Sequence, residues 1–107
     1  MTAGRRPVLW SPESLADLDA IWDYYARAAG RDAADRLVRE IGGLVETIEA
    51  HPLAGRSRDE LRSGIRSIAA GAHVVFYRVA DDIPQIVRVL DGRRDIDEIF
   101  ADGSEET

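Results

Sequence analysis

Two reactive side chains, cysteine and lysine, are missing from this chain of 107 residues. Without cysteine the chain can form no disulfide, no thiolate nucleophile and no cysteine-ligated zinc site. Without lysine there is no amine for Schiff-base chemistry, and arginine supplies all 14 basic residues. Every cation is therefore a planar guanidinium, which is suited to bidentate contacts with carboxylates and phosphates.

Long apolar runs and an excess of positive charge are also absent. No apolar stretch approaches the ~18 residues of a membrane span, and no signal-peptide pattern opens the chain, so we expect a soluble, cytoplasmic protein without membrane contact. The net charge of −6, from 20 acidic and 14 basic residues, disfavours direct binding to nucleic acid, because phosphate contacts depend on clustered cations. No nucleotide-binding loop is present, and His51 and His73 form no metal motif, so we expect no cofactor and no metal.

Two amphipathic helices are predicted in the first half of the chain. Ser11-Pro12 predicts a helix start, with serine as the N-cap and proline in the first turn, and Gly30 predicts the end of that helix. A second apolar stripe predicts a helix over 32–50, ended by His51-Pro52. So short a connection predicts an antiparallel helical hairpin.

Strands are predicted on both sides of this hairpin. Residues 5–10 are typical of a short edge strand, and 65–69, 73–80 and 85–90 are predicted as strands joined by tight turns. Asp95 is expected to cap a short C-terminal helical turn through Phe100. The order β-α-α-β-β-β predicts an α+β fold, with the helical hairpin packed on a small antiparallel sheet. We expect residues 1–101 to form a single domain and residues 102–107 to be an acidic, disordered tail.

Alternation along the strands predicts which side chains share a face of the sheet. One face is expected to carry Ile65, Ala69, Val75, Tyr77, Val79, Val87 and Val89, and the other Arg66, Ile68, Val74, Phe76, Arg78, Ile86, Arg88 and Leu90. Since a hairpin covers only one face, the other would be an uncovered patch of arginine and aliphatic side chains. Such a patch is typical of a surface that binds a protein partner. The alternative is a set of solvated arginines whose stems cover a half-exposed sheet.

Several short motifs occur together, in order, along most of the chain. They are Ser11-Pro12-Glu13, Leu15-Ala16-Asp17-Leu18, Ile21-Trp22-Asp23-Tyr24, Pro52 with Gly55-Arg56, Asp59-Glu60-Leu61-Arg62, Gly64-Ile65-Arg66-Ser67, Val75-Phe76-Tyr77-Arg78-Val79, Ile86-Val87-Arg88-Val89-Leu90 and Arg94-Asp95. Over about residues 8–100 this pattern resembles the RelE/ParE toxin superfamily, and in particular its ParE-like branch. The resemblance implies a toxin of a type II toxin–antitoxin pair that inhibits DNA gyrase and growth. It also implies neutralisation by a ParD-like antitoxin, and contact with DNA only through that antitoxin.

The RelE-like branch differs in chemistry, because its members cleave messenger RNA on the ribosome and need groups that exchange protons. Their pattern has a tyrosine eight residues after the glycine that ends the last strand. That glycine is Gly92 here, and the corresponding residue is Phe100, which cannot exchange a proton. We therefore predict a toxin that acts by binding and is not an enzyme. Two alternatives stay open: a ribosome-dependent endoribonuclease that uses Arg93, Arg94 and His73, and a non-toxic corepressor that only binds the antitoxin.

Two groups of residues are expected to make the contacts. Target binding is expected at the loop and helical turn after the last strand, on Arg93, Arg94, Asp95 and Phe100. ParE-like chains often read Leu-His-Gly-Ala-Arg-Asp where this chain has Asp91 and Arg93 around Gly92. Antitoxin binding is expected on Trp22, Tyr25, Arg56, Arg58, Arg62 and Arg66, where an acidic antitoxin segment would meet forked guanidiniums. For the two aromatic residues, the alternative is plain packing in the core.

Overall fold

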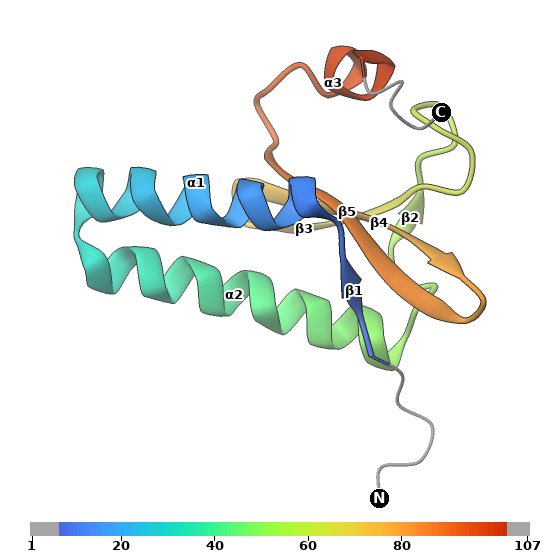
Figure 1. Ribbon diagram of the computed structural model, residues 1–107, viewed down its shortest axis with the longest axis horizontal. Coiled ribbons are helices and arrows are strands. Elements are labelled where there is room, and N and C mark those ends of the chain that lie inside the picture. Colours follow the sequence, from blue (N-terminus) through green and yellow to red (C-terminus); the bar gives the residue numbers. More distant parts are fainter. Residues whose placement is uncertain (1–6, 103–107) are drawn as a thin grey trace, which may run out of the picture.

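A computed structural model describes residues 7–102. It confirms the expected α+β class, with a helical hairpin on one side of a sheet and a short helix near the C-terminus (Figure 1). The described residues leave out 1–6 and 103–107. The start of the expected first strand and most of the expected tail therefore lie outside them. No helix within 7–102 is long and apolar enough to cross a membrane. The elements are β1 Leu9–Trp10, α1 Pro12–Ala29, α2 Arg31–Ala50, β2 Arg56–Ser57, β3 Arg66–Ala70, β4 His73–Ala80, β5 Ile83–Asp91 and α3 Ile96–Asp102.

The capping signals of the first helix are used as expected. The Ser11 side chain accepts a hydrogen bond from the Ser14 backbone N–H at 3.0 Å, Pro12 is the first helical residue, and Gly30 ends the helix with a φ of 100°. Gly30 is also the only residue between α1 and α2. A turn this tight, at a backbone conformation that glycine adopts without strain, folds the two helices into the hairpin.

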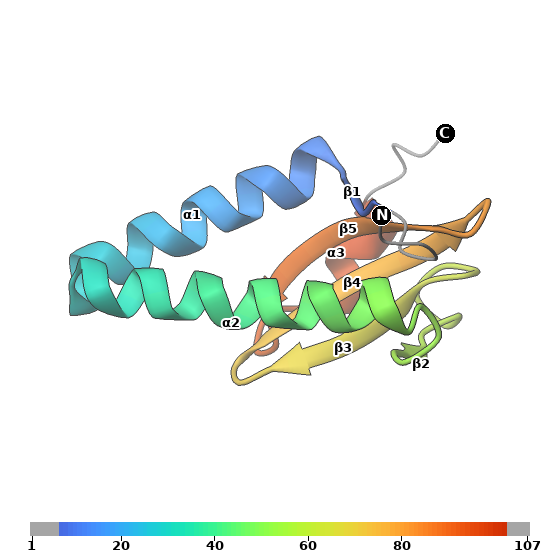
Figure 2. The same cartoon turned by 90° about the horizontal axis from the view of Figure 1, so that it is seen from below.

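One face of the sheet is covered by the hairpin, as Figure 2 shows from the side of α2. Ile41, Val45 and Ile48 of α2 pack there on side chains of β4 and β5, which include Val75 and Tyr77. Full burial of each such aliphatic side chain contributes about 1.5–3 kcal/mol. This packing holds α1 and α2 on the sheet.

The sheet has five strands in the order β1-β5-β4-β3-β2. Its central hairpins are antiparallel as expected, but β1 pairs parallel with β5, so the sheet is mixed. The two-residue β2, in a segment for which the sequence predicted neither helix nor strand, pairs antiparallel with β3. Both edges of the sheet are thus very short strands, which limits edge-to-edge association.

A β-bulge in β5 changes the expected distribution of side chains between the faces. Phe76 pairs with Arg88 and Tyr77 pairs with Ile86, so Val87 is an extra residue opposite β4. Ile86 therefore lies on the hairpin side, and Val87 packs on the opposite, outer face. The expectation that these two residues occupy the reverse faces was wrong, because a bulge interrupts the period of two.

The predicted faces of β3 were also wrong. Ile68 pairs with Val75 and packs on the hairpin side, whereas Ile65 is buried with Phe76 on the outer face. Arg66 pairs with Tyr77 and so faces the hairpin side. The cause is a register shifted by one residue from the expected one, which reverses every side chain of the strand.

The outer face is covered at its centre and not open as expected. Ile65, Phe76, Leu90 and Phe100 form a second buried cluster there. Figures 1 and 2 show α3, which carries Phe100, on the side of the sheet away from the hairpin. The Phe76 and Phe100 rings meet edge to face at 5.0 Å, an arrangement that aromatic pairs favour. Sequence alternation could not reveal this cover, since it comes from a different segment of the chain.

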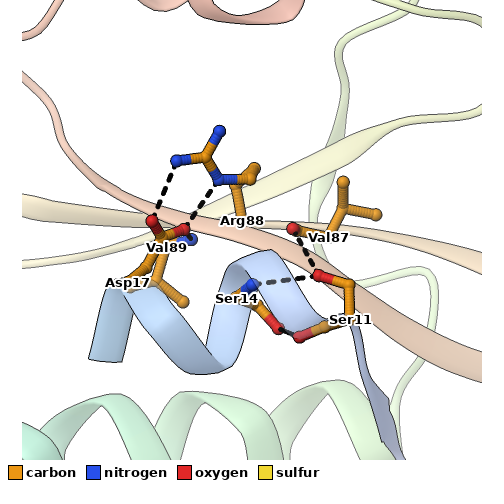
Figure 3. Close-up of polar contacts among 6 residues, drawn as sticks. All are labelled: Ser11, Ser14, Asp17, Val87, Arg88 and Val89. Carbon is orange, nitrogen blue, oxygen red and sulfur yellow. Dashed lines mark hydrogen bonds and ion pairs between the residues drawn. The ribbon is translucent and has the colours of Figure 1, made fainter. Parts of the chain in front are cut away.

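The bulge is fastened to the start of α1 by side-chain hydrogen bonds, as Figure 3 shows. Asp17 accepts two hydrogen bonds from the Arg88 guanidinium, both at 2.8 Å, and a third from the Val89 N–H at 2.9 Å. The Ser11 hydroxyl donates to the Val87 carbonyl at 2.8 Å. These four bonds, which we call the Asp17 clamp, join α1 to the strand that ends at the candidate site.

Tyr77 fixes the loop after α2. Its hydroxyl donates to the Pro52 carbonyl at 2.7 Å and accepts from the Gly55 N–H at 2.8 Å. A Cβ atom at residue 55 would lie 2.7 Å from the tyrosine hydroxyl, so only glycine allows this approach. The loop is thereby held to the core by a buried polar group that is fully paired.

Candidate functional site

The loop after β5, where target binding was expected, is built around Asp91. This carboxylate accepts hydrogen bonds from the Arg93 backbone N–H at 2.8 Å and from its guanidinium at 3.0 and 2.8 Å. The Arg93 hydrogen bonds hold the pKa of Asp91 well below its usual range, and Asp91 raises the pKa of Arg93. The charge of Arg93 is thus balanced locally, although 84% of its side chain is exposed.

Arg94 and Asp95 differ from Arg93 in their partners. Arg94 is exposed, and within residues 7–102 its guanidinium has no ion pair. Asp95 is exposed and accepts a hydrogen bond from the Glu98 N–H at 3.1 Å, so it caps α3 as expected. Of the two arginines, Arg94 is the one whose charge no ion pair within residues 7–102 neutralises.

Phe100, the fourth residue expected at the target-binding surface, is instead 5% exposed in the outer-face cluster. Its ring packs on Phe76, and the Arg62 guanidinium lies over it at 5.2 Å from the centroid. The side chain therefore anchors α3 on the sheet. Burial on this scale leaves the ring without a surface for a partner.

The loop after β5 borders a pocket of about 460 Å³ between α1 and the ends of β4 and β5. Tyr24 stands at its edge with 65% of its surface exposed, and its ring meets that of Tyr25 edge to face at 5.1 Å. Aromatic rings beside guanidinium groups are enriched in protein–protein interfaces. We call this site the tyrosine–arginine pocket; its lining is Asp17, Ala20, Ile21, Tyr24, Tyr25, His73, Val89, Asp91, Arg93 and Arg94.

Of the two neighbouring tyrosines of this pocket, the sequence pointed to Tyr25, as an antitoxin contact, and not to Tyr24. Tyr25 lies on the apolar stripe of α1 and is half-buried between Tyr24 and His73, whose ring is 5.8 Å away. Tyr24 lies off that stripe. A large aromatic side chain on the polar side of a helix has no role in the core, and this was the signal that could have identified it.

His73 lies at the base of this pocket and is only 3% exposed. Burial lowers the pKa of its imidazole, an effect that Asp91 opposes and Arg93 reinforces. Its Nδ1 has no hydrogen-bond partner in the described part of the chain. The side chain is therefore a neutral, buried group at neutral pH, packed against Tyr25. It is not placed to exchange protons with a polymer outside.

The residues expected to bind the antitoxin lie on both sides of the sheet. Trp22 is half-buried, and its Nε1 donates to Asp35 of α2 at 2.9 Å, so it ties the hairpin together. Arg66, on the hairpin side, donates to the Gly55 carbonyl at 2.7 Å and thus supports the loop that Tyr77 holds.

The other three arginines, Arg56, Arg58 and Arg62, lie on or beside the outer face of the sheet. Arg56 is exposed in β2. Arg58 lies over the Phe76 ring at 5.6 Å and donates to Glu60 at 2.7 Å, a hydrogen bond that lowers the pKa of Glu60. The six expected residues therefore do not form one continuous surface, although Arg58 and Arg62 meet the same aromatic pair.

A second cavity, of about 610 Å³, opens on the outer face beside α3. We call it the arginine cavity, because three guanidinium groups line it. Its lining is Leu9, Trp10, Ser11, Glu13, Arg62, Arg78, Gln85, Ile86, Val87, Arg88, Ile99 and Phe100. Across the described chain, no group of three or more histidine or acidic residues could hold a metal ion.

Comparison with known proteins gives consistent matches along this architecture. Residues 8–96 match the family described as "ParE toxin of type II toxin-antitoxin system, parDE". "Toxin ParE1" of Mycobacterium tuberculosis (strain ATCC 25618 / H37Rv) is 40% identical over 90 residues, which are 83% of this chain and 92% of that protein. "Toxin ParE1" of Caulobacter vibrioides is 41% identical over 85 residues, which are 79% and 88% of the two chains.

A solved structure has the same fold. It is described as "Chromosomal ParDE TA system from P. aeruginosa", and its TM-score is 0.72 at 26% identity. The match covers 81% of this chain and 96% of the other. The family match ends at residue 96, where α3 begins, so it includes the loop after β5 and the two tyrosines of the pocket, Tyr24 and Tyr25, but not Phe100.

Proposed function

This chain belongs to the ParE toxin family of type II toxin–antitoxin systems, and from that membership we propose that it arrests growth by binding DNA gyrase until a ParD-like antitoxin neutralises it. The observation that carries the proposal is the family match over residues 8–96, which spans every helix and strand except α3. We place its action in the cytoplasm, with DNA reached only through the antitoxin.

Binding without catalysis is supported by the state of the groups near Arg93 and Arg94. The imidazole of His73 is buried, and Asp91 is a tightly paired carboxylate whose lowered pKa makes it a poor acid and a poor base near neutral pH. Phe100 offers no proton. A ribonuclease would need an acid and a base within reach of the RNA, so these observations favour an inhibitor over an enzyme.

For the target contact, we propose Tyr24 and Arg94 as the central residues of the tyrosine–arginine pocket, with Arg93 and Asp95 at its border. Tyr24 offers an exposed ring, and Arg94 a guanidinium that has no ion pair within residues 7–102. Exposed tyrosine and arginine side chains are frequent hot spots in interfaces, because they combine large contact area with hydrogen bonding.

The test is regulated expression of the chain without its antitoxin, followed by assays of purified protein on gyrase supercoiling and cleavage. We expect growth arrest, signs of DNA damage and inhibited supercoiling. Arg94→Glu should weaken all three, whereas Arg39→Glu, an equal charge change on the exposed side of α2, should not.

Each alternative function predicts a different result. Normal gyrase activity in the presence of the protein would refute the target assignment. Messenger RNA cut in phase with codons after induction would restore the endoribonuclease. Harmless expression with intact antitoxin binding would instead identify a non-toxic corepressor.

A further inference from the structure

Asp91 and Arg93 form an internal ion pair at the border of the tyrosine–arginine pocket. The Asp91 carboxylate accepts hydrogen bonds from the Arg93 backbone N–H at 2.8 Å and from Nε and Nη2 of its guanidinium at 3.0 and 2.8 Å. A forked guanidinium next to a backbone N–H is an arrangement with which proteins hold an external carboxylate or phosphate. Asp91 therefore occupies, from within the chain, the donors that an anion from outside would need.

The backbone around Asp91 keeps this carboxylate in place. Asp91 is the last residue of β5, and the N–H of the next residue, Gly92, donates to the Ala72 carbonyl at 2.7 Å. The Arg94 N–H donates to the Asp91 carbonyl at 3.1 Å and closes the turn. A carboxylate held two residues from its arginine acts at an effective concentration of roughly millimolar or above, so a dilute anion in solution competes poorly for Arg93.

Without this pair, the pocket would suit a single-stranded nucleic acid. The guanidiniums of the two arginines Arg93 and Arg94 line it together with two tyrosine rings of α1. Aromatic rings next to cations are a common platform for bases and their phosphates. The other carboxylate in the lining, that of Asp17, is held in the clamp, so Asp91 sets how many of these cations are free.

With the pair formed, the same lining suits a protein side chain better. Arg94 is the lining guanidinium that has no ion pair within residues 7–102, and one cation can meet one carboxylate. A phosphate chain binds through several cations at once, so a site with one free cation holds it weakly. The exposed Tyr24 ring, with Ile21 and Val89, offers apolar contact in the same pocket. A single acidic side chain beside an apolar one therefore fits this lining.

We propose that Asp91 is a specificity-determining residue of the tyrosine–arginine pocket, because it holds Arg93 as an internal anion and thereby excludes phosphate chains in favour of a single carboxylate on Arg94. The inference deepens the proposed function and rests on it in one respect, namely that the partner is a protein. It accounts for how a loop with two neighbouring arginines serves a protein target without drawing the toxin onto DNA or RNA.

Removal of the Asp91 charge tests this exclusion as a gain of binding. Asp91→Asn keeps an oxygen that can accept from the Arg93 backbone N–H, but it releases the guanidinium. In fluorescence anisotropy with labelled single-stranded oligothymidylate, this variant of the full chain should bind at least fivefold more tightly than the unaltered chain. The slope of log affinity against log salt should steepen by about 0.7, the contribution of one additional phosphate contact on a single strand.

Two matched variants separate this effect from a general change of charge. Asp19→Asn removes the same charge from an exposed position of α1 and should change the affinity by less than twofold. Adding Arg93→Gln to Asp91→Asn restores the net charge, and it should return the affinity to that of the unaltered chain because the released guanidinium is gone. No gain with Asp91→Asn, an equal gain with Asp19→Asn, or a gain that survives Arg93→Gln would each overturn the proposal.

A second experiment compares two small anions by following the NMR signal of the Arg94 Nε–H. In the unaltered chain, N-acetyl-Glu-Phe amide should shift this signal more than inorganic phosphate does at the same concentration, and Asp91→Asn should reverse the order. A larger response of the unaltered chain to phosphate would overturn the preference for a carboxylate.

Inhibition of gyrase supercoiling by the unaltered chain is measured separately from these binding assays. A gain of oligothymidylate binding by Asp91→Asn, without gyrase inhibition by the unaltered chain, would refute only the proposed target. Gyrase inhibition without that gain would refute only the role of Asp91.

Discussion

Removing the Asp17 carboxylate should be among the most damaging single changes on α1, because this one side chain accepts three hydrogen bonds from β5. Asp17→Ala would leave the Arg88 guanidinium and the Val89 N–H without the acceptor that now lies 2.8–2.9 Å away. The side chains of Arg88 and Asp17 are 25% and 12% exposed, so the bonds are largely shielded from water. Water can replace them only in part.

The expected cost follows from this partial burial. Breaking a fully buried ion pair costs about 3–5 kcal/mol, and one hydrogen bond to a charged group contributes about 1.5–3 kcal/mol. Since Arg88 can regain some hydration, we expect Asp17→Ala to lower the free energy of unfolding by about 2–4 kcal/mol. For a domain of this size that corresponds to a fall in Tm of roughly 10–25 °C.

Urea unfolding followed by the fluorescence of Trp10 and Trp22 would measure this loss. Asp19→Ala is the matched control, because it removes the same charge from the same helix at an exposed position, and its cost should stay within about 0.5 kcal/mol. Combining Asp17→Ala with Arg88→Ala should give a coupling energy of at least ~1 kcal/mol. A cost for Asp17→Ala no larger than that of the control would refute the clamp as a source of stability.

Three further changes test other parts of the structure. Tyr77→Phe leaves the buried N–H of Gly55 unpaired and should cost about 1–3 kcal/mol in urea unfolding, with little change in the circular dichroism of the native state. Burial lowers the pKa of His73 below its usual 6.5, so the unfolded state takes up a proton at a higher pH than the folded state does. The buried neutral imidazole therefore contributes its full stability above pH 6.5, and this contribution shrinks as the pH falls below that value. His73→Phe should therefore flatten the loss of stability between about pH 7 and 5, and an unchanged slope would contradict this assignment. Phe100→Ala removes the aromatic anchor of α3 and should speed amide exchange within α3 at least tenfold; unchanged exchange there would show that other contacts hold the helix.

Local sequence signals were sufficient for the helical hairpin. Ser11-Pro12 and Gly30 mark the ends of α1 because capping depends on neighbouring residues alone. The apolar stripe of α2 likewise predicts the face that carries Ile41 and Ile48 into the core. Both features depend on residues within a few positions of each other, which is why the sequence was enough.

The bulge in β5 could not be predicted in this way. Ile86, Arg88 and Leu90 alternate regularly in the sequence, and only pairing with β4 and contacts from α1 make Val87 the extra residue. The parallel pairing of β1 with β5 is equally non-local, since it joins segments from opposite ends of the chain. Register depends on such partners, so sequence alternation alone assigned several strand residues to the wrong face.

The candidate site was predicted in part. Arg93 and Arg94 were identified by their position after the last strand, and the structure brings them beside Tyr25. The apolar spacing of Ile96, Ile99 and Phe100 was a further signal in the sequence for the cover of the outer face. An apolar stripe on so short a helix needs an apolar surface to pack against.

The Asp17 clamp also has a consequence for the order of events while the protein is being made. Its two sides lie 71 residues apart in the chain, and β1 finds its partner strand at a similar separation. Proteins whose stabilising contacts join residues so far apart in the sequence fold slowly, because the long intervening loop must close before the contacts can form. The hairpin emerges from the ribosome well before the strand that fastens it, so a nascent chain has no sheet on which to dock it. The tyrosine–arginine pocket and the arginine cavity are both lined by residues of β5, so they can form only after that strand has been synthesised.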